Sequence, residues 1–214
     1  MKHPFEVQDI AVISNWLDSG SINIFGMPFS GKDTQGQILA DMFDGTLMGG
    51  GDILRNSEIP PSTKRAMQKG LLVPSEDYVD IVLPYLAQEE FAKQPLILSS
   101  VGRWHGEEEG VIEATRKSGH PLVAVIYLKI TEEEVDSRWA KSQEKRSIGD
   151  RGYRHDDTPE ILVTRLEEFK QKTLPVLDYY KNTDLYYEID AAKPAVEVTA
   201  DILNILYELA DKDD

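Results

Sequence analysis

The chain has 214 residues, 41% of them hydrophobic, which is the size and apolar content of one compact α/β domain with a sizeable core. Its 23 basic and 38 acidic side chains give a formal net charge of −15. This charge argues against binding of nucleic acid or anionic membranes, although a local group of arginines in a cleft can still bind a small anion, and the absence of cysteine excludes disulfides and thiolate zinc sites.

The N-terminal segment lacks the basic stretch and apolar run of a secretory signal, and no part of the chain approaches the ~18 apolar residues that cross a bilayer. We therefore expect a cytoplasmic protein. Residues 4–18 place apolar side chains at roughly helical spacing, and Gly20 can end that helix. We expect residues 1–20 to form a helical extension that docks on the core or on a partner, and residues 21–214 to form the main domain.

A short apolar strand over residues 21–25 runs directly into the glycine-rich loop 26–31, which opens a helix. Glycines at both ends of the loop allow close approach to phosphates, and the helix N-terminus supplies positive potential. Lys32 can reach the β- and γ-phosphates of a nucleotide. An ordinary glycine turn is the alternative, but the strand–loop–helix context is the one a phosphate loop requires. The residues expected to bind ATP here are Gly26, Ser30, Gly31, Lys32, Asp33 and Thr34.

Strand-like and helix-like segments alternate along the rest of the chain. The further expected strands are residues 46–48, 96–98, 123–128 and 185–189. The main expected helices are residues 75–91, 107–118, 132–141, 159–180 and 195–209. This alternation predicts a three-layer α/β fold with a five-stranded parallel sheet covered by helices on both faces. Two segments interrupt it, 49–74 and 142–158, and the polar, arginine-rich second one is expected to be an exposed, mobile loop.

Several motifs resemble the adenylate kinase family in their order and spacing. Residues 26–35 resemble the family's loop, Gly-x-Pro-x-x-Gly-Lys-x-Thr-Gln. Residues 50–55 resemble Ser-Thr-Gly-Asp-x-Leu-Arg, and residues 70–73 resemble Gly-x-Leu-Val. The remaining matches are the strand and arginine of residues 96–103, Arg138 in a helix, Arg154-His155-Asp156-Asp157 with Arg165-Leu166, and Asp190-Ala191-Ala192-Lys193-Pro194. The resemblance covers about residues 22–206 and depends on the joint order of the motifs.

The resemblance implies a P-loop NTPase fold and a short-lid nucleoside monophosphate (NMP) kinase. Such an enzyme transfers the γ-phosphoryl group of ATP reversibly to AMP or another NMP, with Mg²⁺ carried by ATP, no zinc, and a monomeric chain. Residues 49–74 would bind the acceptor and residues 142–158 would form the lid, and closure of both would exclude water.

The resemblance also assigns the site residues. The catalytic residues it implies are Lys32, Arg103, Arg138, Arg154 and Arg165. Arg138 and Lys193 are implied as further ATP contacts. The implied NMP-binding residues are Gly50, Gly51, Arg55, Val73, Arg103, Glu107, Arg154 and Arg165. Arginine suits this chemistry because guanidinium binds phosphate oxygens bidentately and stays ionised while charge spreads over the transferring group.

One departure from the family pattern concerns the metal. Ser99 stands where the family has an aspartate that orients waters on Mg²⁺, whereas Asp33 follows Lys32, where many P-loop proteins have a metal-binding hydroxyl. We hypothesise that the acidic metal partner has moved from the strand to the loop, with Ser99 acting through a Mg²⁺-bound water. The alternative is that Asp33 only favours the helix N-terminus electrostatically.

A second departure concerns the acceptor base. Glu107 stands where the family has a base-reading glutamine, and Gly50 replaces a base-contacting threonine. An ionised carboxylate can only accept hydrogen bonds, so the preferred base stays open, and Glu108 or Glu109 could occupy the position instead. Two other functions also stay open: a nucleotide-binding protein of the same fold with weakened catalysis, and a P-loop kinase of another small molecule.

Overall fold

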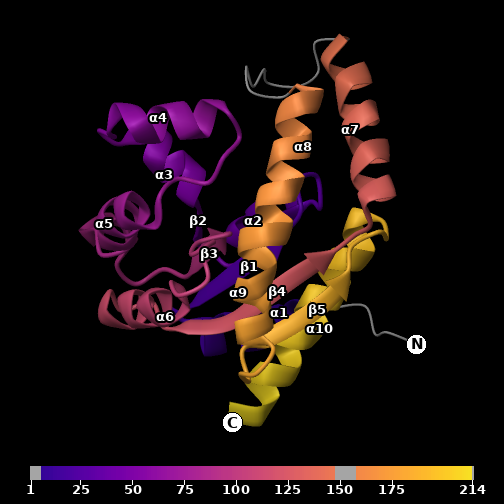
Figure 1. Cartoon of the computed structure of the whole chain (residues 1–214). Helices are drawn as coiled ribbons and strands as arrows, with labels where there is room; N and C mark the ends of the chain where they lie inside the picture. The colour runs from indigo at the N-terminus through magenta and orange to yellow at the C-terminus, as the bar shows by residue number, and fades with distance from the viewer. Residues whose placement is uncertain (1–5, 148–157, 214) are drawn as a thin grey trace.

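In the computed structural model of the chain, residues 6–147 and 158–213 are described (Figure 1). Within them, parallel strands form one five-stranded sheet in the order β2-β3-β1-β4-β5. The strands are β1 (Ser21–Gly26), β2 (Thr46–Gly49), β3 (Leu96–Ser99), β4 (Leu122–Lys129) and β5 (Tyr186–Asp190). This confirms the predicted sheet, and each strand begins and ends within one residue of its predicted bounds because it is a short apolar run bounded by turn residues.

Helices cover both faces of the sheet (Figure 1). On one face α2 (Lys32–Met42) contacts α10 (Ala195–Asp213), and α1 (Val7–Leu17) packs against α10. On the other face α6 (Glu108–Lys117) contacts β4 and α9 (Leu174–Tyr180). Ile13 and Leu17 of α1 are buried in the main apolar core, so this helix docks on the chain's own core.

The segment 49–74, which interrupts the alternation, contains two helices, α3 (Gly50–Asn56) and α4 (Pro61–Gln68). The single helix predicted over residues 75–91 is wrong. It consists of α5 (Ser75–Tyr85), which contains Pro84 in its last turn, and a separate 3₁₀ turn, Glu89–Phe91. Proline lacks an N–H and disfavours continuation of the helix, which is consistent with this break. A second apolar cluster lies beneath α3, α5 and α6, against β2 and β3.

Two helices rise above the sheet beside the other interruption (Figure 1). α7 (Glu132–Ser147) continues six residues beyond its predicted end. α8 (Pro159–Glu168) begins after the N-cap Thr158, whose hydroxyl accepts from the Ile161 N–H. A π-helical turn, Phe169–Thr173, joins α8 to α9 within the predicted helix. The predicted lid therefore lies largely outside the described residues. No described helix combines the length and apolarity needed to span a membrane.

Candidate active site

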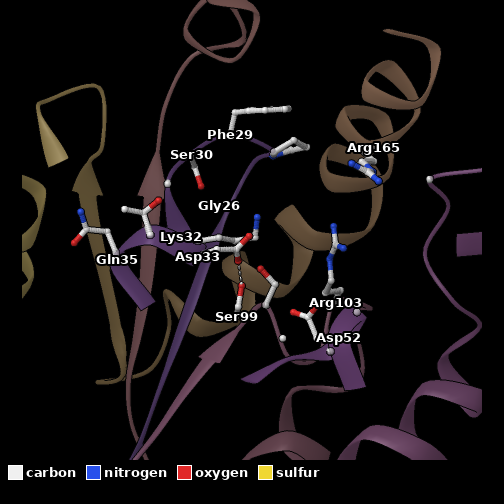
Figure 2. Close-up of a pocket in the computed structure, with 18 of the residues that line it drawn as sticks. Gly26, Phe29, Ser30, Lys32, Asp33, Gln35, Asp52, Ser99, Arg103 and Arg165 are labelled. Atoms are coloured by element: carbon white, nitrogen blue, oxygen red, sulfur yellow. Dashed lines mark hydrogen bonds between the residues drawn. The ribbon is translucent and has the colours of Figure 1, made fainter. Parts of the chain in front are cut away.

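A cavity of about 670 Å³ lies at the carboxyl ends of β1, β2 and β3 (Figure 2). This edge of a parallel sheet is where open α/β folds bind ligands. The residues predicted to take part in binding or catalysis that line it are Gly26, Ser30, Gly31, Lys32, Asp33, Thr34, Gly50, Gly51, Arg55, Val73, Ser99, Arg103, Arg138, Arg165 and Lys193. The fold thus brings together residues from both halves of the chain. Arg154, predicted as catalytic and NMP-binding, lies outside the described residues.

The phosphate loop connects β1 to α2 in a tight turn. A Cβ at Gly26 would lie 2.8 Å from the Cβ of Ser30, so only glycine fits this close approach. Gly31, at the N-cap of α2, has a φ of 95°, in the left-handed region that favours glycine. Ser30 is buried, and its Oγ has no hydrogen-bond partner among the described residues. An orphaned buried hydroxyl in such a loop indicates a place for a ligand oxygen.

Asp33 and Ser99 meet at the base of this loop. Asp33 lies in the first turn of α2, and Ser99 ends β3, the neighbour of β1 in the sheet. The Ser99 hydroxyl donates a hydrogen bond of 2.7 Å to Asp33 Oδ1 (Figure 2). The two positions that depart from the family pattern are therefore direct neighbours, as the hypothesis of an exchanged carboxylate requires.

Arg138 and Lys193, which are predicted to contact ATP, line the cavity, and both side chains already interact with other parts of the protein. The Arg138 guanidinium donates to the backbone carbonyls of Phe29 and Ser30, both at 3.2 Å, and to that of Ala191 at 2.5 Å. It thereby ties the phosphate loop to the segment after β5. The ammonium of Lys193 forms an ion pair of 2.8 Å with Asp201 on α10.

At the opposite end of the cavity, the described residues include three arginines. Arg55 on α3 forms an ion pair of 2.6 Å with Asp52 and is about half exposed, at 48%. Arg103 and Arg165 point toward the same region (Figure 2). The Nε of Arg103 is enclosed and has no partner among the described residues. Desolvation lowers the pKa of Arg103, and the nearby guanidinium of Arg165 lowers it further. A desolvated cation beside a second cation favours an anionic ligand.

The loop that presents Arg103 is fixed from inside the sheet. Asn23 on β1 donates to the Val101 carbonyl at 2.7 Å and accepts from the Val101 N–H at 3.2 Å. This pair anchors the chain directly after β3. No motif signalled it, because an asparagine within an apolar strand gives no indication of its partner.

Glu107 holds the other end of the same loop. Its carboxylate accepts from the N–H groups of Arg103 at 2.9 Å and Trp104 at 3.1 Å, and from the Ser75 hydroxyl. Glu107 is buried and is not among the described residues that line the cavity. This geometry does not support the prediction that Glu107 reads the acceptor base, because its oxygens are committed to shaping the loop.

Gln35, Tyr78 and Trp104 also line the cavity and were missed from the sequence. Gln35 donates to the Ala195 carbonyl at 2.9 Å and accepts from Thr199, which joins α2 to α10. Trp104 directly follows Arg103, and this adjacency was the available signal. Tyr78 lies in α5, where helical periodicity indicates packing and gives no hint of a cavity.

Comparison with known proteins identifies similar chains. A family model described as "Adenylate kinase" matches residues 24–185. The adenylate kinase of Methylorubrum populi is 32% identical over 190 residues, which span 86% of this chain and 94% of that protein. The adenylate kinase of Dehalococcoides mccartyi is 30% identical, with coverage of 87% and 97%. That of Lachnoclostridium phytofermentans is 29% identical, with coverage of 88% and 99%.

Among solved structures, a gluconokinase from Sinorhizobium meliloti 1021 superimposes with a TM-score of 0.60. The match covers 90% of this chain and 94% of that chain at 20% sequence identity. At this identity the likeness shows the fold alone.

Proposed function

Because the chain belongs to the adenylate kinase family, we propose that it transfers the γ-phosphoryl group of ATP reversibly to a nucleoside monophosphate, giving ADP and a nucleoside diphosphate. Family membership makes it a phosphotransferase that acts on nucleotides. In this proposal ATP binds at the phosphate-loop end of the cavity. The acceptor binds at the end formed by residues 49–74 and the loop after β3.

The observation that carries the proposal is that the Arg103 guanidinium is desolvated and lies near a second guanidinium. Its enclosed Nε lacks a partner among the described residues, and a second guanidinium, that of Arg165, lies close enough to lower its pKa. A largely desolvated guanidinium costs free energy, and an anionic ligand would add to the attraction that Glu107 and Glu168 already provide. The same cavity contains the orphaned hydroxyl of Ser30 in the phosphate loop. Two anion-binding ends in one cavity suit a donor and an acceptor that both carry phosphate.

The chemistry asks for positioning and charge stabilisation more than for covalent help from the protein. An oxygen of the acceptor phosphate attacks the γ-phosphorus, and the bond from that phosphorus to the β–γ bridging oxygen breaks. The attacking oxygen is already anionic, so no general base is needed. Lys32 and the loop amides hold the donor phosphates, Arg103 and Arg165 neutralise charge at the acceptor, and Arg138 positions the loop. Arg55 and Arg154 complete the proposed set.

The residues at the loop end fit Mg²⁺ carried by ATP. Mg²⁺ prefers oxygen ligands, keeps several waters, and is usually held by one or two carboxylates together with substrate phosphates. Asp33 supplies one carboxylate, and the Ser99 hydroxyl fixes its orientation. No three His, Asp or Glu side chains gather into a metal-binding group in the part of the chain that the structure describes, so ATP would supply the remaining ligands. When bound, the ion would neutralise charge on the β- and γ-phosphates.

A coupled assay tests the function. The protein is supplied with ATP and, separately, AMP, GMP, CMP or UMP, with and without Mg²⁺. We expect diphosphate product with at least one acceptor and none without the metal. ATP binding by calorimetry is measured in parallel. Tight ATP binding with no product from any acceptor would favour the alternative of a nucleotide-binding protein with weakened catalysis.

A further inference from the structure

The acceptor end of the cavity offers few side chains that can read a nucleobase. Apart from charged groups and Ser99, polar side-chain atoms there come from Ser100, Tyr78 and Trp104 among the described residues that line it. The Ser100 hydroxyl lies 3.4 Å from the carbonyl oxygen of Ile24, to which it donates. The indole N–H of Trp104 donates to the Val73 carbonyl at 2.8 Å. Two of the three groups therefore already donate their hydrogen to a backbone carbonyl.

The hydroxyl of Tyr78 is different. It accepts a hydrogen bond of 3.2 Å from the N–H of Gly102, and its own proton has no acceptor among the described residues. Tyr78 is only 7% exposed, and burial raises the pKa of its phenol, so the group stays protonated at neutral pH. A hydroxyl that accepts from the protein and donates nothing to it keeps one donor for a ligand or a water.

The position of this hydroxyl places it beside the acceptor. A Cβ added at Gly50 would overlap the Tyr78 hydroxyl oxygen, so the phenol fills the space over the first turn of α3. That helix also contains Arg55. Gly102 immediately precedes Arg103, and Tyr78 and Arg103 are close enough to influence each other's pKa. Gly50 is thus the residue that leaves room for a donor hydroxyl from α5.

We propose that Tyr78 is a specificity-determining residue of the acceptor site, whose hydroxyl donates a hydrogen bond to a carbonyl oxygen or ring nitrogen of the acceptor's base. This inference rests on the proposed function, because it requires a nucleoside monophosphate in this end of the cavity. Each of the common bases presents such an acceptor atom. A single donor therefore tolerates several bases and sets their relative affinities by how well their acceptor atoms meet it.

Equilibrium binding to the wild type and to Tyr78→Phe tests the proposal. Calorimetry measures AMP, GMP, CMP, UMP, ATP and ribose 5-phosphate, which has the sugar phosphate but no base. We expect the Kd of the bound monophosphates to rise roughly tenfold in Tyr78→Phe, the upper range for one neutral hydrogen bond. The Kd values of ATP and ribose 5-phosphate should stay within about twofold, since neither uses the bond. Tyr85→Phe is the matched control, because Tyr85 lies on the same helix and packs against Phe91.

Other outcomes overturn the proposal. An equal loss for the monophosphates and for ribose 5-phosphate would mean that the hydroxyl acts through Gly102 on the phosphate site. Unchanged Kd values would mean that it touches no ligand. If the wild type binds ATP but no monophosphate, the proposed function fails as well, and this result is distinct from the other two. If Tyr78→Phe does not fold, Gly50→Ala provides a second test. Its Cβ would displace the Tyr78 hydroxyl, so it should cause the same base-dependent loss of affinity.

Discussion

Arg103 and Arg138 are two arginines on the wall of one cavity, yet their surroundings give them different tasks. Arg138 donates hydrogen bonds to three backbone carbonyls and thereby fixes the phosphate loop. Arg103 keeps an enclosed Nε without a partner among the described residues. Both were predicted as catalytic arginines. Their difference arises from carbonyls that lie more than 50 residues away from Arg138 in the chain, at Ala191 and in the phosphate loop.

Arg103→Lys should reduce kcat/KM for the acceptor roughly ten- to hundredfold, through a higher acceptor KM. Lysine keeps the charge but loses the planar fork that binds a phosphate with two bonds, and a charged hydrogen bond contributes about 1.5–3 kcal/mol. Steady-state kinetics with varied acceptor measures the effect. Arg116→Lys is the control, because Arg116 is exposed on α6 and pairs with Glu113. An unchanged kcat/KM in Arg103→Lys would contradict the assigned role.

Asp33→Asn should raise the Mg²⁺ concentration needed for half-maximal activity, since the amide keeps the shape but lacks the charge. Adding Ser99→Asp should lower this Mg²⁺ concentration again in part, because it returns a carboxylate to the adjacent strand end. Electron paramagnetic resonance of Mn²⁺ bound with ATP gives a readout that does not depend on turnover. If Asp33→Asn shows the wild-type metal dependence in both measurements, Asp33 serves only the N-terminus of α2.

At the scale of elements, a chain of contacts ties residues 49–74, the proposed acceptor segment, to α8 and the π-helical turn. Glu168 accepts the Leu72 N–H at 2.8 Å and pairs with Lys172 at 2.5 Å. The Lys172 ammonium lies 4.2 Å from the centroid of the Trp104 ring, and Trp104 holds the Val73 carbonyl. Backbone groups of the consecutive residues Leu72 and Val73 are thus fixed by a residue from α8 and a residue from the loop after β3.

Glu168→Ala should release this segment. We expect faster hydrogen exchange at the Leu72 amide and a several-fold higher acceptor KM, since a part-buried N–H loses its acceptor. Exchange followed by NMR or mass spectrometry on the peptide around Leu72 measures the first effect. Glu167→Ala is the matched control, because Glu167 is the next residue on the same helix and its side chain is exposed. Unchanged exchange at Leu72 would show that other contacts hold the segment.

At the scale of the whole molecule, a chain with a net charge of −15 gathers arginines around one cavity. The net charge does not predict this cluster of arginines. The fold creates the cluster by bringing cations from α3, the loop after β3, α7 and α8 to one edge of the sheet. Arg103 is held there with its Nε desolvated. Such a site serves ligand binding at a cost to the stability of the free protein.

Arg103→Met should therefore leave the melting temperature of the free protein equal to or above that of the wild type, while removing the stabilisation by the acceptor. A ligand present at a hundred times its Kd stabilises by about 2.7 kcal/mol. Differential scanning fluorimetry with and without the best acceptor measures both quantities. Arg116→Met should keep the ligand-induced rise. A lower melting temperature together with a retained rise would contradict the prediction.

The sequence by itself determined the sheet and the phosphate loop. Strands buried on both faces appear as continuous apolar runs, and the loop is a contiguous motif whose glycines are required by its own turn. Local patterns were less informative where neighbours in space decide the outcome. They missed α3 and α4 in the acceptor segment and merged α5 with the following 3₁₀ turn.

Only the tertiary structure decided which polar side chains are available to a ligand. Glu107 was predicted to read a base, but its carboxylate is bonded to the loop that carries Arg103. Tyr78 was not among the predicted site residues, yet it lines the cavity, and its hydroxyl donates to no acceptor among the described residues. The physical reason is that the sequence gives the identity of each side chain directly, whereas the hydrogen-bond partners of that side chain come from segments far away in the chain. The sequence therefore indicates the kind of chemistry, and the fold decides which groups remain to perform it.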